Sequence, residues 1–334
     1  MKPYAIDQQR FHWSVLKPGN LEVIDLEIGD DGEVGMYGEI PPGGFAAIGS
    51  FDGVHLGHAH VLDQALQRTH VGPYVVIFFD PHPQTYFRPD ATPFRLSRIQ
   101  QQMKMFDGLE MDYAVVIRFN DNLARMSADD FARKVLKDAL QLSYVSAGFD
   151  FNFGAGGAGK AADLEASGAT YGFEVAILPC QIGANGQKLS SSAVREALRR
   201  GDTRTAEAIL GRPHMILGEV IVGARQGRTI GFPTINLELG PYLRPKYGVY
   251  ITETRLDDGR WIRGVSNIGI RPTVGGDIEL LETYLFDFDE NLYGAFVETA
   301  LLDYIRPEAK FASFEAMKAG IARDVETARA FFAA

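Results

Sequence analysis

Between residues 45 and 178 the chain repeats one pattern, in which a short, continuously apolar run is followed by a segment with helical spacing. The run at 74–79 is typical of a strand that is buried on both faces of a parallel sheet. A helix is expected to begin at Ser127, because Ser127 and Asp130 have capping-box spacing. This alternation predicts the α/β fold class, a doubly wound domain whose site lies at the carboxyl ends of parallel strands. The other expected strands are 45–48, 113–117, 144–147 and 173–178.

After residues 211–214 the pattern changes to turns and strands without intervening helices. Residues 247–255 and 261–267 flank the turn Asp257-Asp258-Gly259 and predict a hairpin. Two further strands, 278–286 and 296–304, and a closing helix from Ser313 predict a small antiparallel β-barrel with a C-terminal helix. We therefore divide the chain into a lead-in of unassigned role, 1–40, and two domains, 41–212 and 213–334. Within the lead-in, 21–26 has a strand pattern and 30–32 a turn pattern.

Charge and cysteine content narrow the classes of partner. The 334 residues carry a formal net charge of −10 without a Lys/Arg block, so no nucleic-acid partner is expected. The apolar runs are too short to cross a membrane, and no obligate protein partner is indicated. The single cysteine, Cys180, forms no intrachain disulfide, and the N-terminal segment lacks a signal-peptide pattern, so a cytoplasmic location is expected.

The segment Gly49-Ser-Phe-Asp-Gly-Val-His-Leu-Gly-His58 joins the first expected strand to a helical segment. His55 and His58 are three residues apart, so they share one face of the first helical turn. The free N–H groups of a helix N-terminus favour an anion such as phosphate. Gly53 and Gly57 are expected to let a ligand approach the backbone. A metal site that also uses His60 is the alternative, but no further ligands follow at suitable spacing.

A second segment, Ser190-Ser-Ser-Ala-Val-Arg195, precedes a helical pattern that ends at Gly201. By itself it is typical of a helix N-cap, since serine is a preferred capping residue. The same hydroxyls and guanidinium also suit a phosphate, and the two interpretations are compatible.

Together these segments resemble the HxGH and SSTxxR-type elements of the nucleotidyltransferase superfamily. The longer form, with Phe51-Asp-Gly-Val-His55, is similar to the adenylyltransferase half of the bacterial bifunctional riboflavin kinase/FMN adenylyltransferase family. The resemblance implies a nucleotidyltransferase fold for the first domain and catalytic roles for His55, His58 and Arg195. It implies ATP contacts for Gly49, Phe51, Asp52, Gly53, Gly57, Ser191 and Ser192.

In the second half, residues 223–237 resemble the G-x-x-x-GR-x-x-GFPTAN motif of riboflavin kinases, with Ile235 where alanine is usual. Thr234 and Asn236 are two apart in an extended segment, so they share a face. Their oxygens suit Mg²⁺ and an ATP phosphate. The resemblance adds Gly227 and Gly231 to the ATP site; a plain turn into a strand is the alternative.

Residues 282–294 match the family segment that holds the kinase's general base, which the resemblance assigns to Glu282. Glu279 is expected on the opposite face of the strand, and Asp287 in a solvated turn. The resemblance implies flavin contacts for Tyr293 and Arg306. For Arg306, an FMN-phosphate contact and a surface ion pair remain alternatives.

Further flavin contacts are implied in the first domain. The segment Gly148-Phe-Asp150-Phe-Asn-Phe153-Gly resembles the family's G-x-DFxFG element, and His82 lies in its F-x-PHP element. Asn152 and Lys160 depart from the family pattern. The loop that follows, 154–160, also satisfies G-x-G-x-x-G and G-x-x-x-x-G-K. Ala161 replaces the Mg²⁺-binding Ser/Thr of a P-loop, and the loop does not directly leave the first strand, so both nucleotide-loop interpretations are weak.

The function implied by the resemblance is bifunctional. ATP and Mg²⁺ would be used to phosphorylate riboflavin to FMN, and a second ATP would adenylylate FMN to FAD with release of pyrophosphate. A monofunctional FMN adenylyltransferase with a flavin-binding barrel, and a non-enzymatic flavin- or nucleotide-binding regulator, are the alternatives. Retention of Thr234, Asn236 and Glu282 argues against the first, and retention of His55, His58 and Arg195 against the second.

Overall fold

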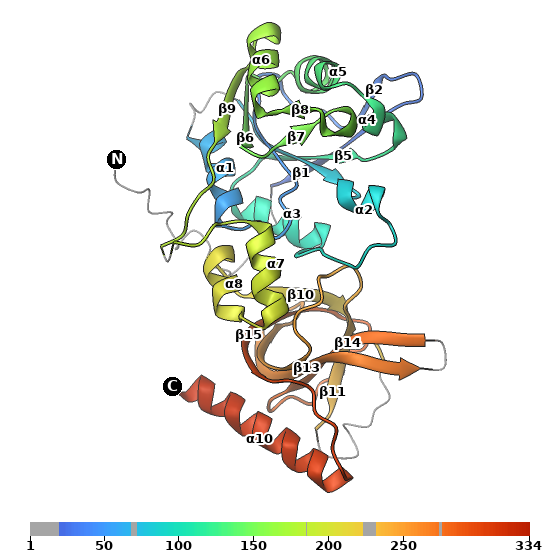
Figure 1. Ribbon diagram of the computed structural model, residues 1–334, viewed down its shortest axis with the longest axis vertical. Coiled ribbons are helices and arrows are strands. Elements are labelled where there is room, and N and C mark those ends of the chain that lie inside the picture. Colours follow the sequence, from blue (N-terminus) through green and yellow to red (C-terminus); the bar gives the residue numbers. More distant parts are fainter. Residues whose placement is uncertain (1–19, 68–71, 185, 223–231, 274–275) are drawn as a thin grey trace. The chain divides into compact units, whose positions relative to one another are not determined.

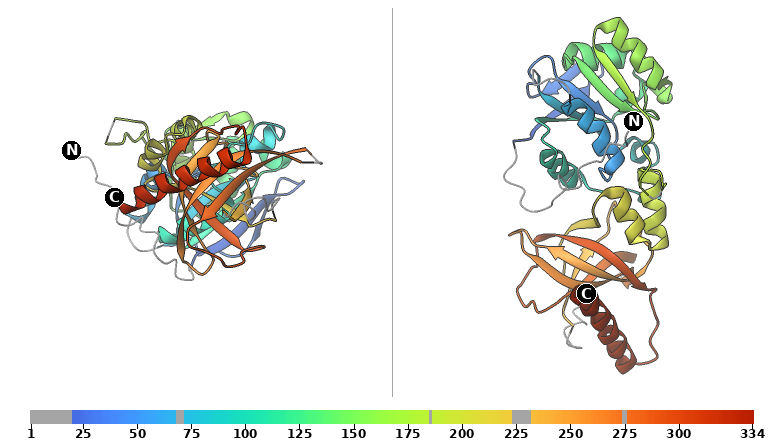
Figure 2. Two further views of the ribbon diagram at one scale, coloured as in Figure 1. Left: turned by 90° about the horizontal axis from the view of Figure 1, so that it is seen from below. Right: turned by 90° about the vertical axis from the view of Figure 1, so that its left-hand side faces the viewer.

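The computed structural model describes residues 20–67, 72–184, 186–222, 232–273 and 276–334. The chain divides into two compact units, one made of residues 1–91 and 99–189, and the other of 92–98 and 190–334. Figures 1 and 2 show the ribbon, and each unit is described by itself.

The first unit contains a seven-stranded sheet in the order β2-β1-β5-β4-β3-β6-β9. The five strands predicted from the apolar runs are all present and all run parallel to their neighbours, as the doubly wound prediction requires. They are β3 (Phe45–Ile48), β4 (Tyr74–Asp80), β5 (Tyr113–Arg118), β6 (Tyr144–Gly148) and β9 (Glu174–Leu178).

The end of the lead-in contributes two more strands to this sheet. β1 (Glu22–Ile28) pairs parallel with β5, and β2 (Val34–Tyr37) closes the edge as an antiparallel strand. Ile24, Leu26 and Ile28 are buried in the core. Residues 22–37 are therefore part of the fold of the first unit.

Helices cover both faces of the sheet. Alternate residues of each strand point to opposite faces and pack against different helices. Val76 and Phe78 pack with residues of α1 (Leu56–Leu66) and α3 (Ile99–Gly108). Val75 and Ile77 belong to a second cluster that includes residues of the π-type helix η2 (Phe131–Ala139) and of α6 (Ala161–Tyr171). The helix predicted at Ser127 is capped as expected, since the Ser127 hydroxyl accepts from Asp130 N–H at 3.0 Å. The elements on this side are α4 (Asp121–Arg125), α5 (Ala128–Asp130), the π-type helix η2 (Phe131–Ala139) and α6 (Ala161–Tyr171), and α2 (Pro83–Phe87) follows β4.

The second unit is a curled sheet of six strands with antiparallel pairing, in the order β10-β15-β12-β13-β14-β11. The two edges of the sheet, β10 and β11, lie close together, as shown by the hydrogen bond from Ile221 N–H, just after β10, to the Asn236 carbonyl of β11 at 2.9 Å. The sheet is thus a partly closed barrel. Its strands are β10 (His214–Glu219), β11 (Thr234–Glu238), β12 (Gly248–Arg255), β13 (Trp261–Thr273), β14 (Gly276–Leu285) and β15 (Phe296–Arg306).

The predicted closing helix is α10 (Phe314–Ala333), which begins after the Ser313 cap and lies along the outside of the curled sheet (Figure 1). Val249, Ile251, Val265 and Phe286 of the sheet pack with Ala328 of this helix. Two shorter helices, α7 (Ser191–Arg200) and α8 (Thr203–Leu210), also belong to this unit. Thr203 Oγ1 donates to the Leu302 carbonyl at 2.9 Å, which explains why they group with the barrel strands.

Candidate functional site

The histidine segment forms the predicted strand-to-helix junction in the first unit. His55 is the N-cap of α1, and its Nδ1 accepts from the His58 backbone N–H at 3.2 Å. The two imidazole rings stack with centroids 3.6 Å apart, and His55 is only 5% exposed. The fold therefore holds both histidines as one pair at a helix N-terminus, where the backbone favours an anion.

The loop before this helix has an unusual backbone. Phe51 and Val54 have φ values of 47° and 38°, a region that bulky and β-branched residues rarely adopt. The buried Gln102 of α3 donates its amide to the carbonyls of Phe51 at 2.9 Å and Ser50 at 3.2 Å. Gln102 thus fixes the strained loop from outside the motif. No sequence signal singled it out, since an isolated glutamine in a helix is ordinary.

The glycines of this segment serve the fold as well as any ligand. Gly53 has a φ of 83°, which requires the left-handed region. A Cβ at Gly57 would lie 2.8 Å from the Leu189 carbonyl oxygen and 3.0 Å from the His55 ring. Close packing inside the protein therefore already requires glycine there, in addition to the expected approach of a ligand. Gly49, Phe51 and Asp52 lie in the same loop, and Asp52 is fully buried.

The segment from Ser190 to Arg195 lies in the second unit. Ser190 caps α7 by accepting from Ala193 N–H at 3.3 Å, and Ser191 and Ser192 are its first two residues. Arg195 Nε donates to the Phe94 carbonyl at 2.9 Å, and its guanidinium lies 5.2 Å from the Phe94 ring centroid. The capping interpretation is confirmed. Joint action of Arg195 with His55 and His58 stays a prediction.

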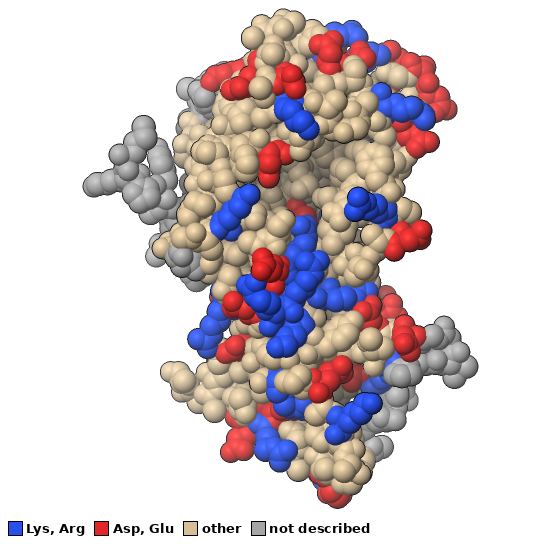
Figure 3. Space-filling view, in the orientation of Figure 1, with Lys and Arg blue, Asp and Glu red and all other residues tan. Residues whose placement is uncertain are grey.

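Positive charge gathers near this helix. Figure 3 shows Lys and Arg side chains clustered over α7 and its surroundings, in a protein whose net charge is −10. The last turn of α7 carries Arg199 and Arg200, both exposed. A locally basic surface therefore exists within an acidic chain, as a phosphate-bearing substrate would favour.

The other candidate flavin residues of the first unit follow β4 and β6. His82 caps α2, and its Nδ1 accepts from Gln84 N–H at 3.1 Å. Asp150 is exposed in the loop after β6. Phe153 is 5% exposed and stacks on Phe151 at 5.6 Å between ring centroids, so its ring belongs to the core.

The glycine-rich loop after Phe153 forms a short antiparallel hairpin rather than a phosphate loop. β7 (Asn152–Phe153) pairs with β8 (Gly159–Lys160), and η3 (Ala155–Gly157) connects them. Lys160 Nζ donates to Asn152 Oδ1 at 2.8 Å and to the Gly157 carbonyl at 2.6 Å. The two residues that depart from the family pattern therefore bind each other, and the lysine is engaged within its own hairpin.

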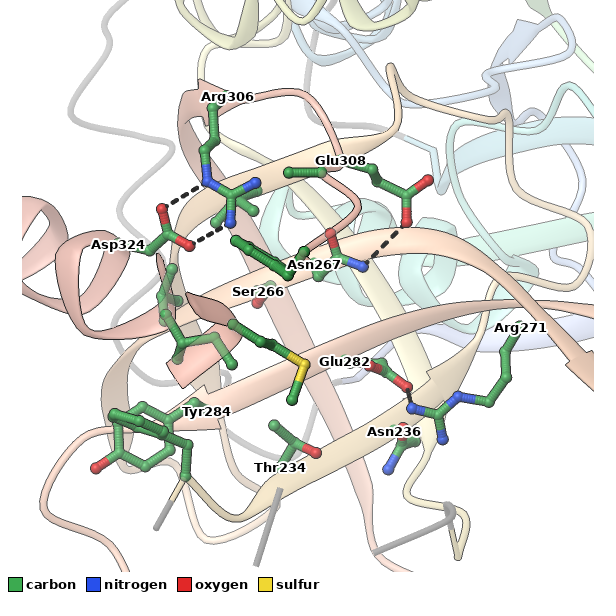
Figure 4. A pocket seen from close by; sticks show the side chains of 17 residues that line it. Thr234, Asn236, Ser266, Asn267, Arg271, Glu282, Tyr284, Arg306, Glu308 and Asp324 are labelled. Atoms are coloured by element: carbon green, nitrogen blue, oxygen red, sulfur yellow. Dashed lines mark hydrogen bonds and ion pairs between the residues drawn. The ribbon is translucent and has the colours of Figure 1, made fainter. Parts of the chain in front are cut away.

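The second unit contains a cavity of about 250 Å³ between the curled sheet and α10 (Figure 4). Four candidate residues line it, namely Thr234, Asn236, Glu282 and Arg306. Polar residues that the sequence did not single out also line it, namely Ser266, Asn267, Arg271, Glu308 and Asp324. The apolar wall includes Phe311, Met317 and Ile321.

Strand register explains why these residues meet. Asn236 of β11 and Asn267 of β13 both stand opposite Glu282 of β14. The row continues through Val249 of β12 to Arg306 of β15. Residues directly opposite each other share one face of a sheet, so one transverse row supplies much of the cavity.

Glu282 lies in a charged but poorly hydrated position. Burial raises the pKa of its carboxyl, and the guanidinium of Arg271, with which it forms an ion pair, opposes that increase. The neighbouring Asn236 is 4% exposed, and its Oδ1 has no hydrogen-bond partner among the described residues. The row thus presents a carboxylate and an unsatisfied carbonyl oxygen side by side.

At the other end of the row, Arg306 of β15 forms an ion pair with Asp324 of α10. Arg306 donates to both carboxylate oxygens of Asp324, at 2.8 Å and 2.7 Å, and Asp324 is 6% exposed. The ion-pair alternative for Arg306 is therefore present, although it is half-buried rather than on the surface.

Two of the residues considered above, Tyr293 and Glu279, do not line the cavity. Tyr293 is outside the cavity lining and packs against the core of the curled sheet. Glu279 pairs with Arg244 and Tyr247 and does not line the cavity, as strand alternation predicted. Gly227 and Gly231 lie outside the described residues.

Comparisons with known proteins decide the family. A family model described as FAD synthetase matches residues 38–193, and one described as riboflavin kinase matches residues 210–332. A protein of Haemophilus influenzae named bifunctional riboflavin kinase/FMN adenylyltransferase is 41% identical over 287 residues, covering 85% of this chain and 93% of the relative. The chain belongs to the bifunctional riboflavin kinase/FMN adenylyltransferase family.

Another member of this family and one solved structure also align with most of the chain. The Escherichia coli K12 protein of the same name is 40% identical over 290 residues and is covered over 91% of its length. A Streptococcus pneumoniae crystal structure titled as a macrolide-efflux protein aligns with a TM-score of 0.76 and 29% identity, covering 87% of this chain and 96% of that chain. Among the described residues, no helix is long and apolar enough to span a membrane.

Proposed function

We propose that this chain phosphorylates riboflavin to FMN in its second domain and adenylylates FMN to FAD in its first. The observation that carries the kinase half is the transverse row, in which Asn236, Glu282 and Asn267 face one cavity. We retain 41–212 and 213–334 as the proposed catalytic domains, and a cytoplasmic location as the proposed site of action.

In the kinase cavity, Glu282 is the proposed general base. Its carboxylate accepts the proton of the riboflavin 5′-hydroxyl as that oxygen attacks the γ-phosphorus of ATP. The ion pair with Arg271 favours the ionised, competent form of the carboxylate before reaction.

The oxygens beside this base fit Mg²⁺. The buried Asn236 Oδ1 has no protein partner in the described part of the chain, and Thr234 lies two residues away on the same strand. Hard oxygen ligands of this kind are those that Mg²⁺ prefers. Thr234 and Asn236 would hold the ion, which supplies positive charge to the ATP phosphates. A group of three or more His, Cys, Asp or Glu side chains suited to a metal was not found among the described residues.

The row also suggests how riboflavin lies. Glu282 and Arg306 are separated by three strand spacings along the row, which is roughly 14 Å between backbones. An elongated flavin can place its hydroxyl end at Glu282 and its ring toward Arg306, against Phe311, Met317 and Ile321. This orientation gives Arg306 a ring-side position and separates it from the phosphoryl group.

In the first domain, His55 and His58 are the proposed donors to the triphosphate of the second ATP, with Arg195 as a further cation. The FMN phosphate oxygen attacks the α-phosphorus, and pyrophosphate leaves. Transfer of this kind depends on positioning and on neutralising charge on oxygens, which a paired imidazole site at a helix N-terminus can provide.

A product assay tests both halves. The protein is incubated with riboflavin, ATP and Mg²⁺, and the flavins are separated by chromatography. The proposal predicts FMN followed by FAD. FAD formation from supplied FMN without any FMN formation from riboflavin would favour the monofunctional alternative, and neither product would favour a binding protein.

A further inference from the structure

We propose that Arg271 contacts the phosphoryl group as it passes from ATP to riboflavin. This inference rests on the proposed kinase activity. Arg271 lies near the end of β13 and lines the cavity. Figure 4 shows its guanidinium pointing toward Glu282, the proposed base, which stands opposite the proposed Mg²⁺ ligand Asn236.

Arg271 is better placed for this role than Arg306. These two are the cationic side chains that line the cavity in the described part of the chain. Both carboxylate oxygens of Asp324 engage Arg306, and its Nη1 also donates to the Pro307 carbonyl at 2.9 Å. Arg306 is also three strands from Glu282, whereas the Arg271 guanidinium already contacts the Glu282 carboxylate.

The charge changes during transfer favour such a contact. The riboflavin oxygen forms a bond to the γ-phosphorus, and the bond from that phosphorus to the β–γ bridging oxygen breaks, so ADP leaves with the electron pair. The hydroxyl proton moves to Glu282, which becomes neutral. Arg271 then loses its anionic partner while negative charge on the phosphoryl oxygens lies beside it. A guanidinium has five donors in a planar fork, so it can turn from a carboxylate to a phosphoryl oxygen without leaving the cavity.

The first test compares Arg271→Gln and Arg271→Lys with Arg263→Gln. Arg263 is a matched control, because it is also on β13 and pairs with a cross-strand carboxylate, Glu253, at 3.6 Å, but lies outside the cavity lining. Arg271→Gln should lower kinase kcat about 100- to 1000-fold, the usual loss for one charge-stabilising donor, with little change in riboflavin KM. Arg271→Lys should lower kinase kcat roughly tenfold, because lysine keeps the charge but lacks the planar fork. The kcat of Arg263→Gln should equal that of wild type.

If Arg271→Gln does not fold, the same comparison of kcat and KM is made with Arg271→Lys. A kcat of either folded Arg271 variant equal to that of Arg263→Gln would overturn the proposal.

The second test separates contact with phosphate from mere positioning of the base. The double variant Arg271→Gln/Glu282→Gln is compared with Glu282→Gln alone, using the residual kinase rate. If Arg271 contacts the phosphoryl group, the double variant should be at least about tenfold slower than Glu282→Gln. If Arg271 acts only through Glu282, the two rates will be equal and the proposal fails. Absence of FMN formation by the wild-type protein would instead remove the proposed kinase function, so the two failures are distinguishable.

Discussion

Asn236 stands directly opposite Glu282 across β11 and β14, and both side chains line the same cavity. The Asn236 Oδ1 is buried without a protein partner among the described residues. A buried acceptor left without a donor destabilises a fold by about 1–3 kcal/mol. The position therefore makes physical sense if a substrate-bound cation supplies the missing interaction.

Replacing Asn236 by leucine tests whether this side chain lowers the stability of the fold in exchange for binding a cation. Leucine has a similar size and removes the unsatisfied carbonyl, so the thermal unfolding midpoint of Asn236→Leu should equal or exceed that of wild type. The Mg²⁺ concentration for half-maximal FMN formation should rise at least about tenfold, because a proposed ligand is lost. A lower unfolding midpoint with unchanged Mg²⁺ dependence would show that Asn236 has a structural role.

Glu282→Gln should lower kinase turnover by roughly two to four orders of magnitude, since glutamine keeps the shape but cannot accept the proton. Riboflavin KM should change little, and adenylylation of supplied FMN should be unaffected. Asp287→Asn is the control, because Asp287 pairs with Arg329 and its side chain is 76% exposed. Normal turnover in Glu282→Gln, or a large loss in Asp287→Asn, would place the base elsewhere.

The two histidines should differ in their structural cost. His58→Ala and His55→Ala should each slow FAD formation from FMN by about 100-fold, the effect of losing one charge-stabilising donor. His55→Ala also removes the N-cap of α1, so it alone should lose roughly 1 kcal/mol of stability in denaturant unfolding. Equal loss of kinase activity in His58→Ala would indicate global damage rather than a local site.

Gln102 should act as a positioning residue for the adenylyl-transfer loop. Gln102→Met keeps the side-chain length but removes both donors to Ser50 and Phe51, so the strained loop relaxes. FAD formation should fall by roughly tenfold or more through kcat, consistent with a misplaced catalytic group. Gln100→Met, an exposed change on the same helix, is the control. Equal FAD formation by the two variants would contradict a role for this clamp.

The sequence could predict the elements whose pattern is local. Continuous apolar runs such as 74–79 identified the central parallel strands, because these are buried on both faces. β1 was expected as a strand but not as part of this sheet, since alternation over 22–28 does not say which neighbour it pairs with. The strands expected at 261–267 and 278–286 are longer toward each other than their patterns predicted, since β13 continues to Thr273 and β14 begins at Gly276.

Some residues of the candidate kinase site could likewise be predicted from local sequence, and others could not. Thr234, Asn236 and Glu282 could be proposed because motif and strand periodicity place them on one face. Arg271 and Asp324 could not, because their position in the cavity depends on the register of β13 and on the packing of α10, neither of which local sequence encodes. Pairing between strands far apart in the chain supplied that information.

The most direct test of two independent catalytic sites in one chain is to mix two variants, each of which is defective in one of the two activities. Glu282→Gln should make no appreciable FAD from riboflavin because it forms too little FMN, and His58→Ala should accumulate FMN because its FAD formation is about 100-fold slower. When both proteins are incubated together with riboflavin, ATP and Mg²⁺, FMN released by the second should be adenylylated by the first. The account predicts that FAD formation is restored in the mixture, as measured by chromatography. A mixture that forms no more FAD than the two variants form separately would contradict it.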